Sequence, residues 1–336
     1  MIRIADEVRA ATAVVALETT LVAHGFPPGE GVEVGLESER QVRAAGAVPA
    51  TIGVLDGGIV VGLTEPELER FTADARKLGP RDIAVAVAQR AVRAGGAVPA
   101  TVGVLDGEIV VGLTADELHR FGADARKLGP RDIAAAVTQR AVGATTVGGT
   151  LAVCRAAGIK VMATGGLGGV HRGWPTPPDV SADLGALAST QVLVVSSGVK
   201  SLLDVAATTE LLETLSVPVV GYRTNDLPLF YAAHGGPPVS ARVESAHEAA
   251  ALARAHWEIG GGGLLVGRPP DESLDDAEPL IERALAEAES QGVHGQAVTP
   301  FVLSYLHRES GGRTLAANRD LIVGNARLAG EIAVLL

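Results

Sequence analysis

Cysteine and aromatic side chains are scarce in this chain, and no apolar run is long enough to cross a membrane. The single cysteine, Cys154, excludes an intramolecular disulfide and a cysteine-ligated metal cluster, and its amphipathic surroundings predict a buried filler. Aromatic residues make up only 3% of the 336 residues, so the core must consist of aliphatic side chains. The amino-terminal residues include early acids and lack the apolar stretch of a signal peptide. These absences predict a cytoplasmic protein without a membrane partner.

Positive charge is also in deficit. The chain has 28 lysines and arginines against 39 acidic residues, a net charge of −11. Binding to a nucleic-acid backbone needs a basic face, so we expect no nucleic-acid partner. An anionic small molecule would have to be held by individual Lys or Arg side chains and backbone N–H groups.

Aliphatic residues are abundant, and hydrophobic residues reach 47% of the chain. Short apolar runs alternate with alanine-rich amphipathic segments along the whole length, which is typical of α/β proteins. We therefore predict one domain over residues 1–336, a three-layer α/β/α fold with a mostly parallel central sheet and small accessory strands. The predicted strands include 14–17, 159–163, 191–195, 217–221 and 263–266, and the predicted helices include 29–45, 148–157, 245–259 and 276–290.

Residues 44–93 and 94–143 are near copies of each other, with 40 of the 50 aligned positions identical. Two copies are too few for a solenoid, so the pattern indicates a tandem duplication inside the domain. Each copy is predicted to form a strand, an Asp-Gly turn, a second strand and two helices, opened by Thr64 or Thr114 and then by a Gly-Pro pair. Neither copy has lost its apolar strands. We expect one copy to occupy the place of a single unit and the other to pack at an edge.

Two apolar runs, 159–163 and 191–195, end in segments that carry candidate chemistry. The first ends at the glycine-rich loop 165–169, where the backbone can approach a bound group closely. The second leads through Ser196-Ser197-Gly198 to Lys200. If Ser196 or Ser197 caps a helix over 202–206, the macrodipole disfavours charge on Lys200. A neutral lysine can form a Schiff base with a sugar carbonyl, whereas a solvated lysine is the ordinary alternative.

Glu18 follows the apolar run 14–17. The carboxyl ends of strands in open α/β sheets are where ligands bind, so Glu18 is a candidate general acid. Desolvation there would raise the pKa of its carboxyl group. The alternative is an ordinary strand-end acid in contact with water.

Several of these stretches together resemble one enzyme family. The motifs GGLGGVHRG at 165–173, DVSADL at 179–184 and SGVKSLLD at 197–204 are similar to those of the pseudouridine-5'-phosphate glycosidases, also called indigoidine synthase A-like proteins. Further matches are ALETTLVAHGFP at 16–27, ATTV at 144–147 and TPF at 299–301. They follow the order of the family across nearly the whole chain.

The resemblance implies a lyase that cleaves the C–C glycosidic bond of pseudouridine 5'-phosphate reversibly to uracil and ribose 5-phosphate. Such an enzyme is a pseudouridylate synthase, a hydro-lyase among the carbon–oxygen lyases, and the family implies a homotrimer. Lys200 would be the Schiff-base nucleophile, Glu18 the proton donor and Asp179 the ligand of Mn²⁺. The implied substrate contacts are Val147, Ser181, Ala182 and Asp183, together with the lysine of a K-x-x-x-R-D motif. For Asp183 a helix-capping role is the alternative.

The K-x-x-x-R-D lysine occurs twice because of the duplication, as Lys77 and Lys127. Lys127 is favoured because it continues without a gap into ATTV at 144–147. Lys77 has the competing merit of following directly from the first strand and helix. His171 and Arg172, in the glycine-rich motif, are candidate anion contacts.

Two other functions compete with the glycosidase interpretation. The α/β pattern and glycine loops are compatible with a sugar or nucleoside kinase, but a phosphate-cradling motif is missing. An inactivated relative is the second alternative, because the duplication could displace the substrate lysine. In addition, Gly324-Asn325 stands where relatives tend to have two asparagines, so the contacts of the first asparagine are not predicted.

Overall fold

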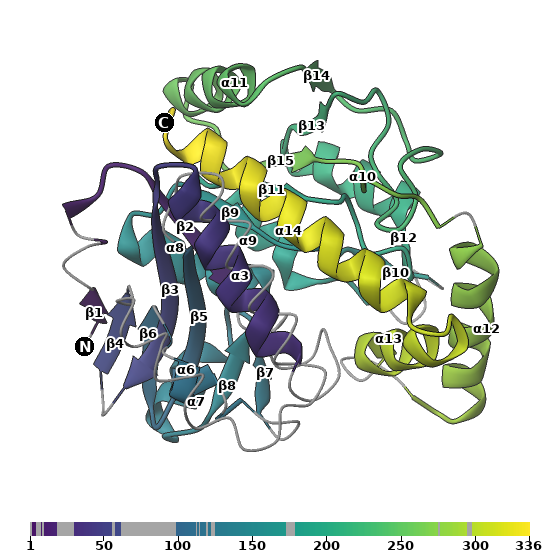
Figure 1. Ribbon diagram of the computed structural model, residues 1–336, viewed down its shortest axis with the longest axis horizontal. Helices are drawn as coiled ribbons and strands as arrows, with labels where there is room; N and C mark the ends of the chain where they lie inside the picture. Colours follow the sequence, from purple (N-terminus) through teal and green to yellow (C-terminus); the bar gives the residue numbers. More distant parts are fainter. Residues whose placement is uncertain are drawn as a thin grey trace.

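The computed structural model arranges the chain around one large β-sheet covered by helices on both faces (Figure 1). The described residues are 2–4, 8, 10–18, 30–55, 58–61, 99–111, 113, 115–118, 120–121, 125–172, 179–274, 276–293 and 298–336. Within these ranges, none of the helices combines the length and the apolarity that crossing a membrane requires.

A run of parallel strands forms the centre of the sheet. In spatial order these strands are β2 (Val14–Glu18), β9 (Val161–Ala163), β11 (Leu193–Ser196), β15 (Leu264–Gly267), β13 (Val219–Tyr222) and β14 (Ala241–Val243). Strands buried on both faces have continuous apolar sequences, which is why the runs in the sequence predicted most of them. The mostly parallel sheet is confirmed.

Alternate residues of these strands face two different helical layers. Val15 and Leu17 belong to the same apolar cluster as Ala329 of α14 (Arg313–Ala333). Ala16 lies in the other cluster, with Leu151 of α8 (Val147–Ala157). In Figure 1, α14 crosses one face of the sheet beside α3 (Glu30–Ala44), while α8 and α9 (Ala182–Ala188) lie behind it. The predicted three-layer α/β/α fold is therefore confirmed.

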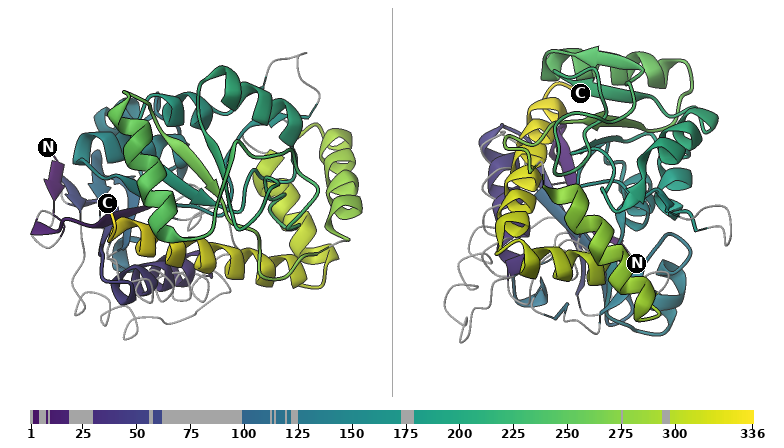
Figure 2. Two further views of the ribbon diagram at one scale, coloured as in Figure 1. Left: turned by 90° about the horizontal axis from the view of Figure 1, so that it is seen from above. Right: turned by 90° about the vertical axis from the view of Figure 1, so that its right-hand side faces the viewer.

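The remaining carboxyl-terminal helices are α10 (Val205–Thr214), α11 (Ala246–Glu258), α12 (Ala277–Ser290) and α13 (Val298–Glu309). Helix α11 contacts α14, and α12 pairs with α13 at one end of the molecule (Figure 2). The helices predicted at 29–45, 148–157, 245–259 and 276–290 agree with the observed ones to within about two residues at each end. Cys154 is fully buried in α8, and this burial raises the pKa of its thiol, as expected for an inert filler.

Both copies of the duplicated segment contribute a hairpin to the same sheet. The first is β3 (Val48–Leu55) with β4 (Gly58–Val61), and the second is β5 (Pro99–Leu105) with β6 (Glu108–Val111). Strand β2 pairs with β3 along Val14–Leu17 and with β5 only at Glu18, opposite Val102. Strand β1 (Ile2–Ile4) pairs with β4. The two helices predicted for the first copy lie outside the described residues.

The second copy differs from its predicted pattern after the hairpin. The helix expected from Thr114 is the single turn α6 (Ala115–Leu118), and the helix expected at Gly129-Pro130 begins only at Ile133, as α7 (Ile133–Thr138). Between them lies a strand that was not predicted, β7 (Arg126–Leu128), which pairs with β8 (Gly143–Thr145). A strand of three residues is too short to show a periodicity, and its pairing partner lies 17 positions away in register.

Candidate functional site

The loops that follow β9 and β11 are hydrogen-bonded to each other at the carboxyl edge of the sheet. The Ser197 N–H donates to the Gly165 carbonyl (2.9 Å), and the Leu167 N–H donates to the Gly198 carbonyl (3.0 Å). The Lys200 N–H then donates to the Leu167 carbonyl (3.1 Å). The backbone of Lys200 is therefore held directly by the glycine-rich loop, as the adjacency of the two strands predicts.

Two glycines allow this close approach. Gly198 has a φ of +79°, and a Cβ at this position would collide with the carbonyl oxygen of Pro228. A Cβ on Gly166 would meet the Phe230 ring and the Cγ of Lys200. The glycine-rich loop thus lies against the base of the Lys200 side chain, which is half-buried.

Lys200 does not lie in the first turn of a helix, and that prediction was wrong. After Lys200 the chain forms the short strand β12 (Leu203–Asp204), which pairs with β10 (Val170–His171). Helix α10 begins only at Val205, because the Asp204 carboxylate accepts the Ala207 N–H (2.9 Å) and caps it. Since the macrodipole effect falls off within one turn, it cannot be used to argue for a neutral amine at Lys200.

Asp183 joins the glycine-rich loop to the amino terminus of α8. One carboxylate oxygen accepts the Gly148 N–H (2.7 Å) and the other accepts the Gly168 N–H (3.1 Å). The side chain is buried, so these backbone donors replace its hydration. The cap of α9 is instead Ser181, whose hydroxyl accepts the Asp183 N–H (3.2 Å). The capping interpretation of Asp183 was therefore wrong for its own helix.

Val147 and Ala182 are placed by the same two helix starts. Val147 is the first residue of α8, behind the cap Thr146, and its side chain is buried in the core. Ala182 is the first residue of α9 and is exposed. The side chain of Asp183 reaches from α9 to the first turn of α8, so the two helix starts lie close together. The Gly148 and Gly149 N–H groups in the first turn of α8 already donate to the Asp183 carboxylate and to the Thr146 hydroxyl.

His171 lies among the predicted site residues Asp179, Lys127 and Lys200. Its Nδ1 is 3.8 Å from the Asp179 carboxylate, and the backbone N–H of His171 donates to the Asp179 carbonyl (2.9 Å). Burial lowers the pKa of His171; the Asp179 carboxylate opposes this shift, and the charges of Lys127 and Lys200 reinforce it. The four side chains are thus close enough to interact electrostatically. Lys127 reaches this group from the unpredicted strand β7, whereas Lys77 lies outside the described residues.

Asp179 was predicted to hold Mn²⁺. Its side chain is 46% exposed, and the described residues contain no group of three or more acidic, histidine or cysteine side chains arranged as metal ligands. A single accessible carboxylate fits an ion that keeps most of its water ligands, since hard divalent cations prefer oxygen. The residues present therefore fit a water-rich manganese site at Asp179.

Glu18 is the last residue of β2. This strand pairs with β9 on one side, and Glu18 itself pairs with β5 on the other. The neighbouring strand β9 continues directly into the glycine-rich loop, so Glu18 is at the same edge of the sheet as Lys200. The position of its side chain is outside the described part of the structure.

Two side chains in this region have contacts that the sequence did not predict. Asn325, fully buried on α14, donates to the Thr164 carbonyl (2.9 Å) and to the Ser197 hydroxyl (3.1 Å). It thereby links the ends of β9 and β11, and the Gly324-Asn325 pair, which stands where relatives tend to have two asparagines, was the signal for it in the sequence. Arg172, predicted as an anion contact, donates instead to carbonyls of the Lys200 segment and to Glu278.

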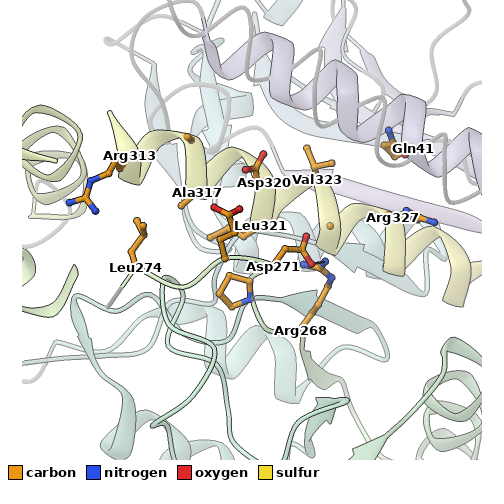
Figure 3. Close-up of a pocket in the computed structure, with 14 residues that line it drawn as sticks. Gln41, Arg268, Asp271, Leu274, Arg313, Ala317, Asp320, Leu321, Val323 and Arg327 are labelled. Carbon is orange, nitrogen blue, oxygen red and sulfur yellow. Dashed lines mark hydrogen bonds and ion pairs between the residues drawn. The ribbon is translucent and has the colours of Figure 1, made fainter. Parts of the chain in front are cut away.

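A pocket of about 490 Å³ lies between α14 and the loop that follows β15 (Figure 3). Arg268, the first residue after β15, lies over Gly324 of α14 and donates to Asp271 (2.6 Å). A Cβ at 324 would meet the Arg268 guanidinium, which would then have to shift. None of the described residues that line the pocket is a predicted site residue.

Comparison with known proteins identifies one family over the whole chain. The family model described as "Indigoidine synthase A like protein" matches residues 3–91 and 89–335. A pseudouridine-5'-phosphate glycosidase of Herpetosiphon aurantiacus is 42% identical over 99% of this chain and 97% of that protein. A protein of the same name from Salinispora tropica is 43% identical over 99% of this chain and 90% of that protein.

Two solved structures have similar folds. The prealnumycin C-glycosynthase AlnA, in complex with ribulose 5-phosphate, is 36% identical with a TM-score of 0.76 and covers 100% of this chain and 97% of its own. An indigoidine synthase A-like protein from Thermotoga maritima is 34% identical with a TM-score of 0.76 and covers 99% of this chain and 96% of its own.

Proposed function

The chain belongs to the indigoidine synthase A-like family, and we propose that it cleaves the C–C glycosidic bond of pseudouridine 5'-phosphate. The products are uracil and ribose 5-phosphate, and the reaction is reversible. Full-length relatives that carry the name of this enzyme support the proposal, as does a structural neighbour that binds a pentose phosphate. The observation on which it rests most is the position of Lys200, held against the glycine-rich loop beside His171, Asp179 and Lys127.

Lys200 is the proposed nucleophile. A carbon leaving group cannot depart after simple protonation of a heteroatom, so cleavage through an opened sugar is the reasonable route. The Lys200 amine bonds to C1' of the sugar, the ring oxygen leaves C1', and the covalent adduct permits the C1'–C5 bond to break. Water then hydrolyses the imine and releases ribose 5-phosphate. One water is consumed for each uracil formed.

Glu18 is the proposed proton donor and acceptor. Uracil can leave only when its C5 receives a proton, and the imine steps also need proton transfer. The position of Glu18 at the end of β2, on the same edge as Lys200, supports this role. General acid–base groups contribute on the order of 10²- to 10⁴-fold to a rate.

The phosphate is assigned to Lys127. Lys127 supplies a positive charge that acts on His171 together with the charge of Lys200. Val147, Ser181, Ala182 and Asp183, at the paired starts of α8 and α9, are the other proposed substrate contacts. Asp179 would hold Mn²⁺, which when bound supplies a positive charge and ordered water to orient the ligand.

The proposal extends to the state of the protein in the cell. We expect a homotrimer in the cytoplasm: the family resemblance supports the trimer, and the single buried cysteine suits a reducing compartment. Light scattering coupled to size-exclusion chromatography tests the trimer. A monomer at micromolar concentration would contradict it.

Two measurements on the purified protein test the proposed function. With Mn²⁺ and pseudouridine 5'-phosphate, the protein should release uracil, and it should not consume ATP in the presence of sugars or nucleosides. Borohydride added with ribose 5-phosphate should give a covalent adduct on Lys200, absent in Lys200→Ala. Lys160→Ala, which removes an exposed lysine stacked on Trp257, is the matched control and should retain the adduct. ATP consumption without uracil release would favour a kinase, and neither activity would indicate an inactivated relative.

A further inference from the structure

The segment from Gly198 to Asp204 carries Lys200 between the end of β11 and the start of α10. On one side it is held by the glycine-rich loop, through the bonds at Leu167 and through the pairing of β12 with β10. On the side that follows Lys200, the Leu203 N–H donates to the Lys200 carbonyl (3.0 Å), which closes a turn. The carbonyls of Ser201 and Leu203 on this turn accept hydrogen bonds from a side chain elsewhere in the sequence.

That side chain is Arg172, which directly follows β10. Its Nη2 donates to the Ser201 carbonyl (2.8 Å), and its Nε donates to the Leu203 carbonyl (3.4 Å). Nη2 also donates to the Glu278 carboxylate on α12 (2.6 Å). The planar guanidinium is suited to holding several acceptors at fixed positions, which a lysine ammonium cannot do equally well.

We propose that Arg172 is a positioning residue for Lys200, clamping the turn that carries the nucleophile and being itself oriented by Glu278. This inference rests on the proposed function for the role of Lys200. Arg172 acts on the backbone at Ser201 and Leu203, one and three residues beyond Lys200, and does not contact the substrate. A displacement of about 1 Å at a reacting group can lower a rate by about 10²-fold, so the clamp has kinetic consequences.

The alternative is that Arg172 binds the phosphate of the substrate. The two roles predict different kinetics. A phosphate ligand contributes to the binding of the ground state, so its loss raises KM for a phosphorylated substrate. Loss of a positioning residue instead lowers kcat and the rate of imine formation together, because the lysine is present but poorly aimed.

The test compares Arg172→Ala, Arg172→Lys and Glu278→Gln with Arg313→Ala. Arg313 is the matched control, since it also pairs with a carboxylate next to α12, Asp276, but contacts no part of the Lys200 turn. For each variant, kcat and KM for uracil release, the rate of borohydride trapping with ribose 5-phosphate, and amide hydrogen exchange over 198–204 are measured.

In Arg172→Ala we expect kcat and the trapping rate to fall together by about 10- to 100-fold, with KM changed less than about threefold. Exchange should accelerate within 198–204 and nowhere else in the sheet. Arg172→Lys should recover part of the loss, and Glu278→Gln should show a smaller decrease in the same direction. Arg313→Ala should match the wild-type protein in all three measurements.

An increase in KM at unchanged kcat would overturn the inference in favour of a phosphate contact. Unchanged exchange over 198–204 in Arg172→Ala would also overturn it, whatever the kinetics. If the wild-type protein releases no uracil and traps no sugar, the proposed function fails, while the exchange measurement still decides whether Arg172 holds the turn.

Discussion

Asp183 shows how a single buried carboxylate can fix the geometry of a site. Its two oxygens receive N–H groups from Gly148 and Gly168, which lie on different elements. Gly168 must lack a side chain, because a Cβ there would collide with the Asp183 carboxylate and the Ser181 hydroxyl. The glycine in this loop therefore serves close packing as well as backbone conformation.

Replacing Asp183 with Asn should lower the free energy of unfolding by roughly 2 kcal/mol, because the amide NH₂ would face a backbone donor and leave it unsatisfied. Urea unfolding followed by circular dichroism measures the change. Glu282→Gln, an exposed substitution on α12, should leave the unfolding curve in place. Coincident curves for Asp183→Asn and the wild-type protein would contradict the structural role of the carboxylate.

Two glycines in the left-handed region allow conformational strain to be separated from steric collision. Gly158 (φ +73°) ends α8, and a Cβ there meets no atom within 4 Å. Gly198 (φ +79°) faces the Pro228 carbonyl. Gly158→Ala should cost about 1–2 kcal/mol of stability, the ordinary price of the left-handed conformation. Gly198→Ala should cost about 3 kcal/mol or more, because the collision adds to the strain.

Denaturant midpoints of the two variants provide this comparison. Borohydride trapping should also weaken in Gly198→Ala, because the Gly198 carbonyl accepts the Leu167 N–H and so helps to hold the Lys200 turn on the glycine-rich loop. Equal midpoints for the two variants would show that the Pro228 contact has no energetic weight.

Helix α14 connects the elements of the site more than its amphipathic sequence indicates. Asn325 links the ends of two strands, and Gly324, the preceding residue, accommodates Arg268 from the end of a third. Leu321 and Ile322 pack against Gly165 in the glycine-rich loop. The helix therefore positions the loops after β9, β11 and β15 from one face of the sheet.

Helix α13 contains a partly buried histidine, His307, that should make the stability of the fold depend on pH. Burial lowers the pKa of His307 from 6.5 to about 4, and its Nε2 has no hydrogen-bond partner among the described residues. The unfolded chain takes up a proton near pH 6.5 and the folded chain does not. The contribution to stability is therefore complete above pH 6.5 and is lost as the pH falls toward 4, by an amount on the order of 3 kcal/mol.

His307→Leu should flatten the decrease in unfolding free energy between pH 6.5 and 4, as measured by urea unfolding at several pH values. His247→Leu, on the exposed side of α11, is the control and should keep the wild-type slope. If the unfolding free energy of the wild-type protein and of His307→Leu changed equally with pH, the histidine would take up its proton as readily in the folded state as in the unfolded state.

The elements that the sequence predicted are those whose own residues determine them. Central strands such as β9 and β11 are continuous apolar runs, and α3 or α11 have long amphipathic patterns. The short strands β7, β10 and β12 exist only because a partner pairs with them, so no local pattern predicts them. For the same reason the helix expected around Lys200 was wrong, since tertiary pairing of Leu203 and Asp204 overrides their helical pattern.

The candidate site, too, could be predicted from the sequence only where local motifs determine it. Motifs identified Lys200, Asp179 and Asp183 as neighbours, but the partners of Asp183 lie 35 and 15 positions away. The contact of Arg172 with Glu278 spans 106 positions. Such pairs depend on the fold and could not be inferred from spacing in the sequence.

At the scale of the whole molecule, the duplication leaves open which lysine serves the substrate. The charge of Lys127 acts on His171, so we expect Lys127→Ala to weaken the binding of ribose 5-phosphate by roughly 10- to 100-fold. Lys77→Ala should leave the affinity nearly unchanged. Isothermal titration calorimetry measures both, and the reverse pattern would show that the first copy supplies the lysine.

The pairing of β2 with strands of both copies has a consequence for the kinetics of folding. Residues 48–51 and 98–101 have the same sequence, Val-Pro-Ala-Thr, so either copy can dock on β2 while the chain collapses. A chain in which the wrong copy pairs with β2 is kinetically trapped. This pairing must break before the native sheet can form. Refolding after a brief unfolding pulse, which keeps prolines in their native isomers, should show two phases. Deletion of residues 44–93 should remove the slower phase, and single-exponential refolding of the full chain would mean that the two copies never compete.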